Sequence, residues 1–314
     1  MRTQLPLALI AAAFACSLFT APAHAQRARV FVASYGVDAS NTTCSFTQPC
    51  RTFQHALGFV LASGEVTAID SAGFSPVTIT QSVTITSPAG VEAGIAANSG
   101  GAAVIINAPN AAVSLHGLTL EGGGTGGLYG IEVFNAAKVD IVDCVIRDYQ
   151  AGGSSGVGIM VNANAPLKVA ISNTSISNND SAAVMQSGAG AVAVTLDHVT
   201  MTDNTDGIEF LPAGSAAITA MIANSNISHT ANWGIYTGSG TGLANVSLFY
   251  DNFNDNNNAV YLQSNSNLYL SHVNDAHSSN SGIFFASTMG VTAYSDGTSH
   301  LTSFGGSLTS WSPQ

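Results

Sequence analysis

Basic side chains that could act on an anionic substrate are few in this chain of 314 residues. Beyond the first 30 residues the sequence contains four: Arg51, Lys138, Arg147 and Lys168. Lys138 and Lys168 each stand three residues before an isoleucine, Ile141 and Ile171, in segments where apolar and other residues alternate. If the isoleucines point inward on adjacent strands, the two lysines lie in one outward column.

Carboxylates accompany this basic column. Asp140 is expected to lie beside it, and Asp143 and Arg147 follow at the next corner of the chain. A base, carboxylates and a site for a hard cation such as Ca²⁺ would converge here. We therefore predict Lys138, Lys168 and Arg147 as candidate catalytic residues, and Asp140 and Asp143 as candidate calcium ligands. Alternatively, these charged residues form a solvated patch of ion pairs that has no catalytic role.

A second candidate site is a column of aromatic residues. The outward residues of seven successive strands are predicted to be Glu132, Met160, Met185, Glu209, Tyr236, Tyr261 and Phe284. The three rings would form a ladder with a spacing of about 5 Å. Aromatic rings pack on the apolar faces of sugars and a carboxylate accepts hydroxyl hydrogen bonds, so we predict that Glu209, Tyr236, Tyr261 and Phe284 bind carbohydrate. Alternatively, the C-terminal tail covers this strip and buries its own Phe304 and Trp311 there.

A repeat of about 25 residues positions both sites. A motif of a small residue, an aliphatic residue, a variable residue and an apolar residue recurs at starts separated by 28, 25, 24, 27, 25 and 23 residues. A second alternating strand and a corner rich in Asn, Asp and Ser follow each motif, as in Ser177-Asn178-Asn179-Asp180. This pattern predicts the coils of an all-β, right-handed parallel β-helix. Asn suits the corners because it tolerates the left-handed backbone and its amide can stack on the next coil. A β-sandwich would instead show hairpin turns every 8 to 12 residues or so.

The N-terminal region indicates export. Residues 1–25 combine Arg2, an apolar run from Leu5 to Phe19 and the ending Ala23-His24-Ala25, which predicts a cleaved signal peptide. The run is shorter than the roughly 20 residues of a membrane span. We expect no transmembrane segment after cleavage, and a secreted, periplasmic or cell-surface protein.

Residues 26–64 are expected to form an N-terminal segment. Cys44 and Cys50 flank a short loop and are predicted to pair in a disulfide, whereas a metal site would need more ligands. Phe53, Ala56, Leu57, Val60 and Leu61 have helical spacing, which predicts a helix that caps the first coil and ends near Gly64. The β-helix is expected over residues 65–298 and a tail over 299–314. Cys144 lies in a strand pattern and is predicted to be buried.

Composition limits the classes of partner. The chain has 18 acidic and 7 basic residues, a formal net charge of −11, and only 8% charged residues. A basic nucleic-acid binder is therefore excluded.

The run from Cys44 to Phe53, the Gly64-Glu65-Val66 segment and the coils resemble exported bacterial right-handed β-helix proteins of the pectate-lyase-like superfamily. The resemblance covers nearly the whole chain after residue 25. It implies a carbohydrate ligand and, in the lyases, a basic residue that abstracts a proton beside a uronate with help from Asp-bound calcium. Asn204-Thr205-Asp206 resembles an element of polygalacturonases, but the partner elements of that family are absent. Asp197-His198 similarly resembles part of a pectate-lyase motif, but the Trp-Ile that precedes it in that family is absent.

These observations predict a protein that binds polysaccharide. The alternatives are a calcium-assisted lyase of the pectate-lyase type and a structural or adhesive surface protein.

Overall fold

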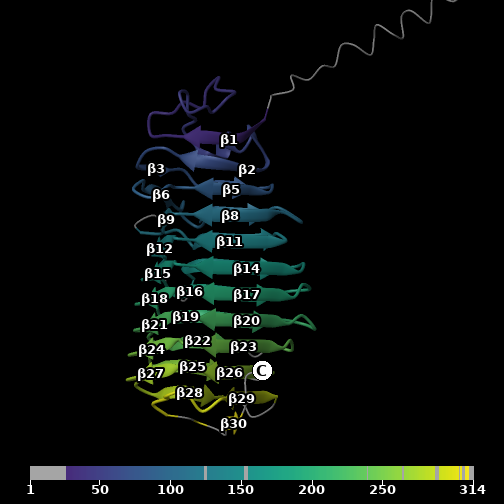
Figure 1. Ribbon diagram of the computed structural model, residues 1–314, viewed down its shortest axis with the longest axis vertical. Helices are drawn as coiled ribbons and strands as arrows, with labels where there is room; N and C mark the ends of the chain where they lie inside the picture. Colours follow the sequence, from purple (N-terminus) through teal and green to yellow (C-terminus); the bar gives the residue numbers. More distant parts are fainter. Residues whose placement is uncertain are drawn as a thin grey trace, which may run out of the picture.

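The computed structural model describes residues 26–123, 126–151, 155–238, 240–263, 265–286, 290–303, 305 and 308–310. Within them the chain winds into a stack of coils, and each complete coil adds one strand to each of three parallel sheets (Figure 1). This arrangement confirms the predicted all-β parallel β-helix. The predicted signal peptide and the tail residues Phe304 and Trp311 lie outside the described residues.

The first sheet has 12 strands and runs the length of the rod. Its strands are β1 (Arg27–Val32), β2 (Val60–Ala68), β5 (Val83–Thr86), β8 (Ala112–His116), β11 (Lys138–Val142), β14 (Leu167–Ser172), β17 (Val192–Asp197), β20 (Ile218–Ala223), β23 (Ala244–Phe249), β26 (Ser266–Ser271), β29 (Val291–Ser295) and β30 (Leu308–Ser310).

The second sheet has nine short strands. They are β3 (Ala72–Phe74), β6 (Ala93–Ala96), β9 (Leu118–Glu121), β12 (Val145–Arg147), β15 (Ser175–Ser177), β18 (Thr200–Thr202), β21 (Asn226–Ser228), β24 (Asn252–Asn254) and β27 (Asn274–Ala276).

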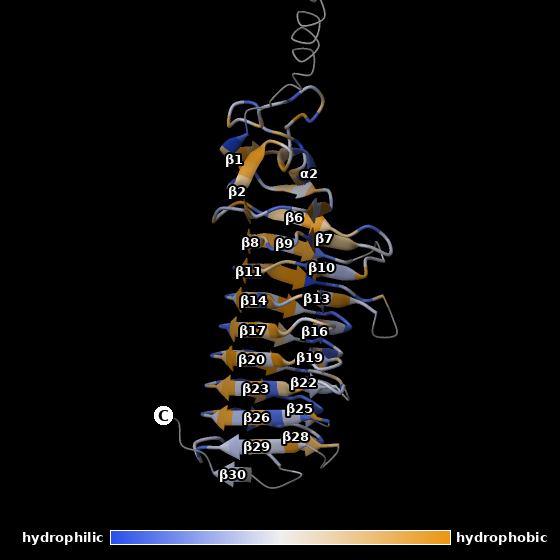
Figure 2. Cartoon of the chain, turned by 90° about the vertical axis from the view of Figure 1, so that its right-hand side faces the viewer, coloured by the Kyte–Doolittle hydropathy of each residue, from blue (hydrophilic) through white to orange (hydrophobic). Residues whose placement is uncertain are grey.

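The third sheet also has nine strands, and it contains the predicted aromatic column. Its strands are β4 (Val77–Ile79), β7 (Ala102–Asn107), β10 (Tyr129–Asn135), β13 (Val157–Ala163), β16 (Ser181–Ser187), β19 (Asp206–Pro212), β22 (Trp233–Thr237), β25 (Asn258–Leu262) and β28 (Ser281–Phe285). In Figure 2 the first and third sheets form the two sides of the rod.

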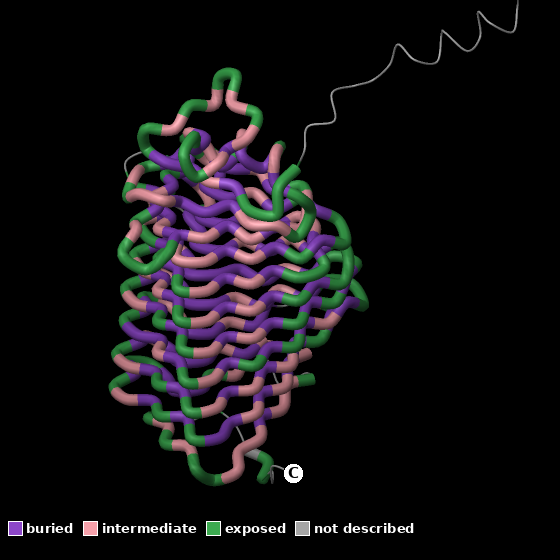
Figure 3. The backbone as a smooth tube through the Cα atoms, turned by 45° about the horizontal axis from the view of Figure 1, so that its top comes forward, coloured by how far each residue is buried: buried purple, intermediate pink, exposed green. Residues whose placement is uncertain are grey.

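Alternation places aliphatic residues inside the rod and the intervening residues outside. In the first sheet, Val139 pairs in register with Val169, and Val169 pairs with Val194. All three side chains are buried. Buried and exposed positions therefore line up in columns from coil to coil (Figure 3). These columns form one continuous apolar core, which confirms the inward residues predicted for this sheet.

One coil departs from the predicted alignment. The register pairs Met160 with Val184 and Val161 with Met185, so Val184 occupies the outward column and Met185 is buried in the core. The prediction that Met185 points outward was wrong. The repeat begins here with two alanines, Ala182 and Ala183, in place of a glycine and a large aliphatic residue, and this leaves the alignment ambiguous by one position.

Glycine begins most of these motifs because adjacent coils approach closely. A Cβ atom at Gly207 would lie 2.0 Å from the carbonyl oxygen of Gly234 in the next coil. A larger side chain would push the two strands apart.

Asparagine, aspartate and histidine turn the chain at two corners. Between the first and second sheets, Asn173 and His198 have φ values of 49° and 56°, and between the second and third sheets Asn178 and Asp203 both have 56°. These left-handed conformations confirm the role predicted for the polar corners. Inside the second corner, the Asn179 side chain donates to Asn204 Oδ1 at 3.0 Å, as expected for amides stacked between coils.

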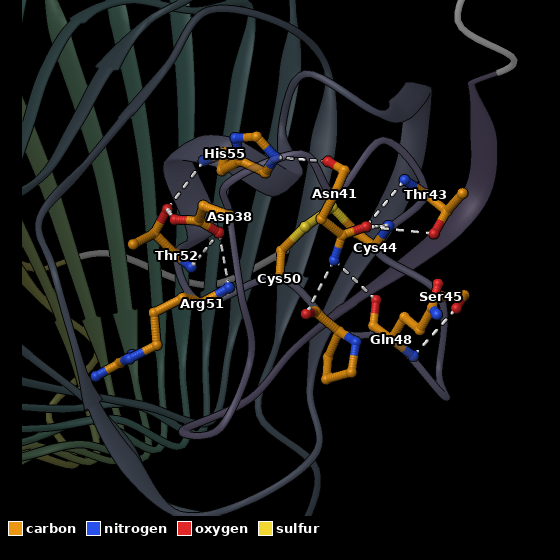
Figure 4. Close-up of a disulfide and its surroundings, with 11 residues drawn as sticks. Asp38, Asn41, Thr43, Cys44, Ser45, Gln48, Cys50, Arg51, Thr52 and His55 are labelled. Carbon is orange, nitrogen blue, oxygen red and sulfur yellow. Dashed lines mark hydrogen bonds between the residues drawn. A yellow bond between two sulfur atoms is a disulfide. The ribbon is translucent and has the colours of Figure 1, made fainter.

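The N-terminal segment folds around the disulfide between Cys44 and Cys50, which confirms the predicted pair (Figure 4). Asn41 organises the loop: its Oδ1 accepts from the backbone N–H of Cys44 at 3.0 Å, and its Nδ2 donates to the Gln48 carbonyl at 3.0 Å. Asp38 Oδ1 accepts from the N–H of Arg51 at 2.7 Å and connects the loop to the residues just after the disulfide.

The predicted capping helix is a single turn, α2 (Phe53–Ala56). Its N-cap, Thr52, accepts from the N–H of His55 at 3.1 Å. The prediction that the helix continues to Gly64 was wrong, because Val60 and Leu61 belong to β2 and Val60 pairs with β1. The period of two in a strand buries Val60 and leaves Leu61 43% exposed, although both were expected on one helical face. No helix among the described residues has the length and apolar character needed to cross a membrane.

Candidate functional site

The outer face of the third sheet carries the predicted aromatic column. The parallel register aligns one outward residue per coil, in the order Thr78, Ile105, Glu132, Met160, Val184, Glu209, Tyr236, Tyr261 and Phe284. The four residues predicted to bind carbohydrate, Glu209, Tyr236, Tyr261 and Phe284, are therefore consecutive neighbours.

Aromatic side chains on β22, β25 and β28 form a continuous aromatic strip, which we define as Trp233, Tyr236, Tyr261 and Phe284. The ring centroids of Tyr236 and Tyr261 are 5.7 Å apart, and those of Tyr261 and Phe284 are 4.9 Å apart. Trp233 stacks on Tyr236 with centroids 4.7 Å apart. The structure brings these rings together because the strands that hold them are successive neighbours in the third sheet.

Sequence reasoning missed Trp233. Strict alternation places it on the same side as Ile235, two residues later, and Ile235 is buried. Trp233 is instead partly exposed. It is the first residue of β22, directly after a corner, where side chains do not yet alternate strictly between the two faces of the sheet. The sequence feature that could have identified Trp233 as a neighbour of the aromatic column is its position three residues before Tyr236.

The stacking determines what the strip presents to a ligand. Tyr261 and Phe284 stack with an interplanar angle of 26°, so each ring gives one face to its neighbour. The outer surface of the strip consequently consists of ring edges and tyrosine hydroxyls, while Phe284, at the end of the column, is 36% exposed.

Two acidic residues lie at the end of the strip on β19. Glu209 Oε1 accepts from Ser181 Oγ at 2.8 Å, and burial raises the pKa of Glu209, with a further contribution from the charge of Asp206. Asp206 is buried and accepts from Asn232 Nδ2 at 2.9 Å. Burial also raises the pKa of Asp206. These carboxyl groups are poorly solvated hydrogen-bonding groups directly beside aromatic rings.

One polar atom of the strip and one of Gln263, whose side chain contacts Tyr236, have unused hydrogen-bonding capacity. Trp233 Nε1 and Gln263 Oε1 are buried and have no hydrogen-bond partner among the described residues. The other end of the Gln263 amide interacts with the Tyr236 hydroxyl. Because buried polar atoms are nearly always paired, this donor and this acceptor would each gain a hydrogen bond from a hydroxylated ligand or water that reached them.

The described part of the C-terminal tail continues the winding. His300 forms a β-bridge with Asn274, and the Ser303 carbonyl accepts from the N–H of Ile283 at 3.2 Å. These residues therefore cover the edges of β27 and β28 at the end of the rod. The tail residues expected to cover the strip, Phe304 and Trp311, lie outside the described residues.

The basic column is present on the first sheet. Lys138 pairs in register with Lys168, as expected for one outward column. Lys138 Nζ lies 2.8 Å from Asp140 Oδ2, and both groups remain accessible to solvent. The structure thus brings together Lys138, Lys168 and Asp140.

The other members of the predicted basic site lie farther along the coil. Asp143 occupies the corner after β11 with a φ of 55°, and Arg147 lies on β12 in the second sheet, where it forms an ion pair with Glu121. Arg147 is therefore not part of the same sheet as the lysines. Asp197 and His198, which resemble part of a pectate-lyase motif, lie at the equivalent corner of a later coil, with His198 Nδ1 2.9 Å from Asp197 Oδ1.

A metal site needs several ligand side chains close together. Among the described residues, one set of three His, Cys, Asp or Glu side chains has its ligand atoms within 4.8 Å of one another, namely Cys44, Cys50 and His55. The disulfide uses both sulfur atoms, so this set offers no thiolate ligands. Asp140 and Asp143 are not part of any such set in the described parts of the chain.

Comparisons with known proteins give a family and a fold. The family described as "Right handed beta helix region" matches residues 93–275. A search of curated proteins found no significant match. Among solved structures, the chain is similar to one titled "Crystal structure of pectate lyase Pel9A", with a TM-score of 0.61 and 11% sequence identity. The similarity covers 86% of this chain and 75% of that chain.

Proposed function

The chain belongs to the right-handed β-helix family, and from this premise we propose that it binds a polysaccharide on the outer face of the third sheet. The observation that carries the proposal is the aromatic strip together with the unpaired polar atoms Trp233 Nε1 and Gln263 Oε1. The similarity of its fold to a structure named as a pectate lyase supports a polysaccharide as the class of ligand.

The chemistry of the strip suits a sugar chain. Sugars combine apolar C–H surfaces with hydroxyl groups that both donate and accept hydrogen bonds. Trp233 Nε1 can donate to a hydroxyl oxygen, while Gln263 Oε1 and the Glu209 carboxylate can accept from hydroxyl groups. The ring edges and the exposed Phe284 supply the apolar contact.

Replacing Tyr236 and Tyr261 together by alanine tests the proposal. We expect at least a tenfold loss of affinity for any polysaccharide that the protein binds, measured by affinity electrophoresis and calorimetry, because the double variant removes the centre of the strip. The matched control replaces Tyr269 and Tyr294 by alanine. These two rings also stack between coils, with centroids 4.8 Å apart, but they lie on the first sheet.

The control should bind as the wild type does. Unchanged affinity of the Tyr236→Ala/Tyr261→Ala protein, with circular dichroism that shows intact folding, would exclude the aromatic strip as the binding site.

A calcium-assisted polysaccharide lyase is the second candidate function. The observation in its favour is the contact between Lys138 and Asp140 beside Lys168. Asp140 and Asp143 would hold the ion, and a lysine would abstract the proton.

Export is also part of the proposal. The signal-like residues 1–25 support it, and so does the disulfide between Cys44 and Cys50, since disulfides persist in oxidising compartments.

A further inference from the structure

The third sheet contains no basic residue. Its nine strands include no Lys, Arg or His, and the sequence of the connections from this sheet to the first sheet contains no charged residue at all. Lys and Arg residues in the described part of the chain lie elsewhere: Arg27, Arg29, Lys138 and Lys168 on the first sheet, Arg51 in the N-terminal segment and Arg147 on the second sheet. The aromatic strip is therefore on a sheet without cations.

Acidic residues do occur on this sheet. Glu132 and Glu209 belong to the same outward column, and Asp206 begins β19. Asp180, immediately before β16, lies close enough to Asp206 to raise its pKa. Burial raises the pKa of Glu132 as well. The protein already makes ionisation of these carboxyl groups costly, and a further negative charge beside them would add to that cost.

The imidazole of His229, at the corner between the second and third sheets, is already surrounded by carboxylates. His229 Nδ1 lies 4.0 Å from Asp203 Oδ1, and its Nε2 lies 3.7 Å from Asp255 Oδ2. Its two ring nitrogens therefore face carboxylates of this corner and not the outer face of the third sheet.

We propose that the ligand of the aromatic strip is a neutral polysaccharide and that the strip rejects polyuronates. This inference depends on the proposed function, because it specifies the ligand class of the same surface. A polyuronate carries a carboxylate on every sugar and would place several of them against Glu209 and Asp206 without a basic partner. A neutral glycan presents only hydroxyl groups, which Glu209, Gln263 and Trp233 can pair.

The test compares polymers with one backbone and different charge. Polygalacturonate and its fully methyl-esterified form serve as the matched pair, and galactan, xylan, mixed-linkage glucan and glucomannan extend the neutral set. We expect a neutral polymer to bind at least tenfold more tightly than polygalacturonate at low ionic strength and pH 7.5. Added salt should reduce the difference in affinity between the neutral polymer and polygalacturonate, because salt screens the repulsion between polymer carboxylates and the acidic residues of the third sheet.

Glu209→Gln probes the origin of the discrimination. The variant keeps an acceptor oxygen but removes the charge, so we expect affinity for polygalacturonate to rise severalfold while affinity for the neutral polymer changes less. Unaltered discrimination in this variant would contradict the role given to Glu209.

The outcomes separate the two proposals. If polygalacturonate binds more tightly than every neutral polymer and the Tyr236→Ala/Tyr261→Ala variant loses that binding, the strip is a polysaccharide site but the ligand is not neutral. If no polymer binds, or if binding is unaffected by the double variant, both proposals fail.

Discussion

At the scale of single residues, Asp251 is a carboxyl group enclosed in the rod. It lies directly after the first corner and is 0% exposed. Its Oδ1 accepts from the N–H of Ser225 at 2.8 Å, and its Oδ2 accepts from the N–H of Phe249 at 3.0 Å. Burial nevertheless raises the pKa of Asp251 from 3.8 to about 7, so loss of solvation outweighs the two hydrogen bonds.

This shift predicts a pH dependence of stability. Because the folded-state pKa of Asp251 is higher than the unfolded value, the folded protein holds the proton more tightly, and the group stabilises the fold fully below about pH 4. That stability is lost as the pH rises through about 7. The difference between the folded and unfolded pKa limits the stability that Asp251 can lose over this pH range to about 4 kcal/mol.

Asp251→Ser isolates this contribution. Ser225 has the same position in the preceding coil, where its hydroxyl accepts from Val199 at 3.1 Å and donates to the Ala223 carbonyl at 2.8 Å. We expect the urea midpoint of the wild type to fall relative to that of the variant between pH 4.5 and 7.5. Parallel pH profiles for the two proteins would refute the assignment.

At the scale of elements, the second corner depends on amides inside the rod. Asn204 Nδ2 donates to the carbonyls of Ile176 at 3.1 Å and Thr202 at 3.2 Å. Its Oδ1 accepts from the backbone N–H of Asn179 at 3.0 Å. One side chain thus pairs backbone groups of β15, of β18 and of the corner that follows β15, and so holds adjacent coils in register.

Asn204→Ala should destabilise the protein by about 2–4 kcal/mol, because several buried backbone groups lose their partners. Asn204→Thr is the matched control. Thr230 occupies this position in the next coil and pairs with Asn256 through its hydroxyl at 2.8 Å. Chemical unfolding followed by circular dichroism should show a smaller loss for threonine. Equal losses for both variants would contradict the expectation that a hydroxyl at this position can replace part of the hydrogen bonding of the amide.

At the scale of the whole molecule, the basic groups near the middle of the rod are on different faces from the acids beside the aromatic strip. The lysine column is on the first sheet, Arg147 is around the corner on the second sheet, and the acids near the aromatic strip are on the third sheet. Lys138 and Arg147 each already contact a carboxylate, Asp140 and Glu121 respectively. Lys138 and Lys168 share one surface, but Asp140 already pairs with Lys138, so little positive charge is left there to neutralise a polyuronate.

The purified protein, incubated with calcium and polygalacturonate, should consequently release no unsaturated products. Ultraviolet absorbance over several hours measures their formation, and a commercial pectate lyase serves as the positive control. A rise in absorbance that Lys138→Ala or Lys168→Ala abolishes would instead favour the lyase function.

The sequence by itself determined the coils. Side chains alternate with a period of two within each strand, and the strand motif recurs about every 25 residues, so both patterns can be recognised without knowledge of the tertiary structure. The columns that contain Lys138 with Lys168, and Tyr236 with Tyr261, follow directly from these periods. Short-range chemistry likewise predicted the disulfide between Cys44 and Cys50.

Only the tertiary structure decided features that depend on how coils meet at corners. Contacts between coils set the register that buries Met185, and the pairing of β1 with β2 makes Val60 part of a strand. The corner geometry turns Trp233 outward to complete the aromatic strip and carries Arg147 onto the second sheet. The physical reason is that alternation fixes the side of a residue within a strand, whereas its position around the rod depends on the path of the chain through each corner.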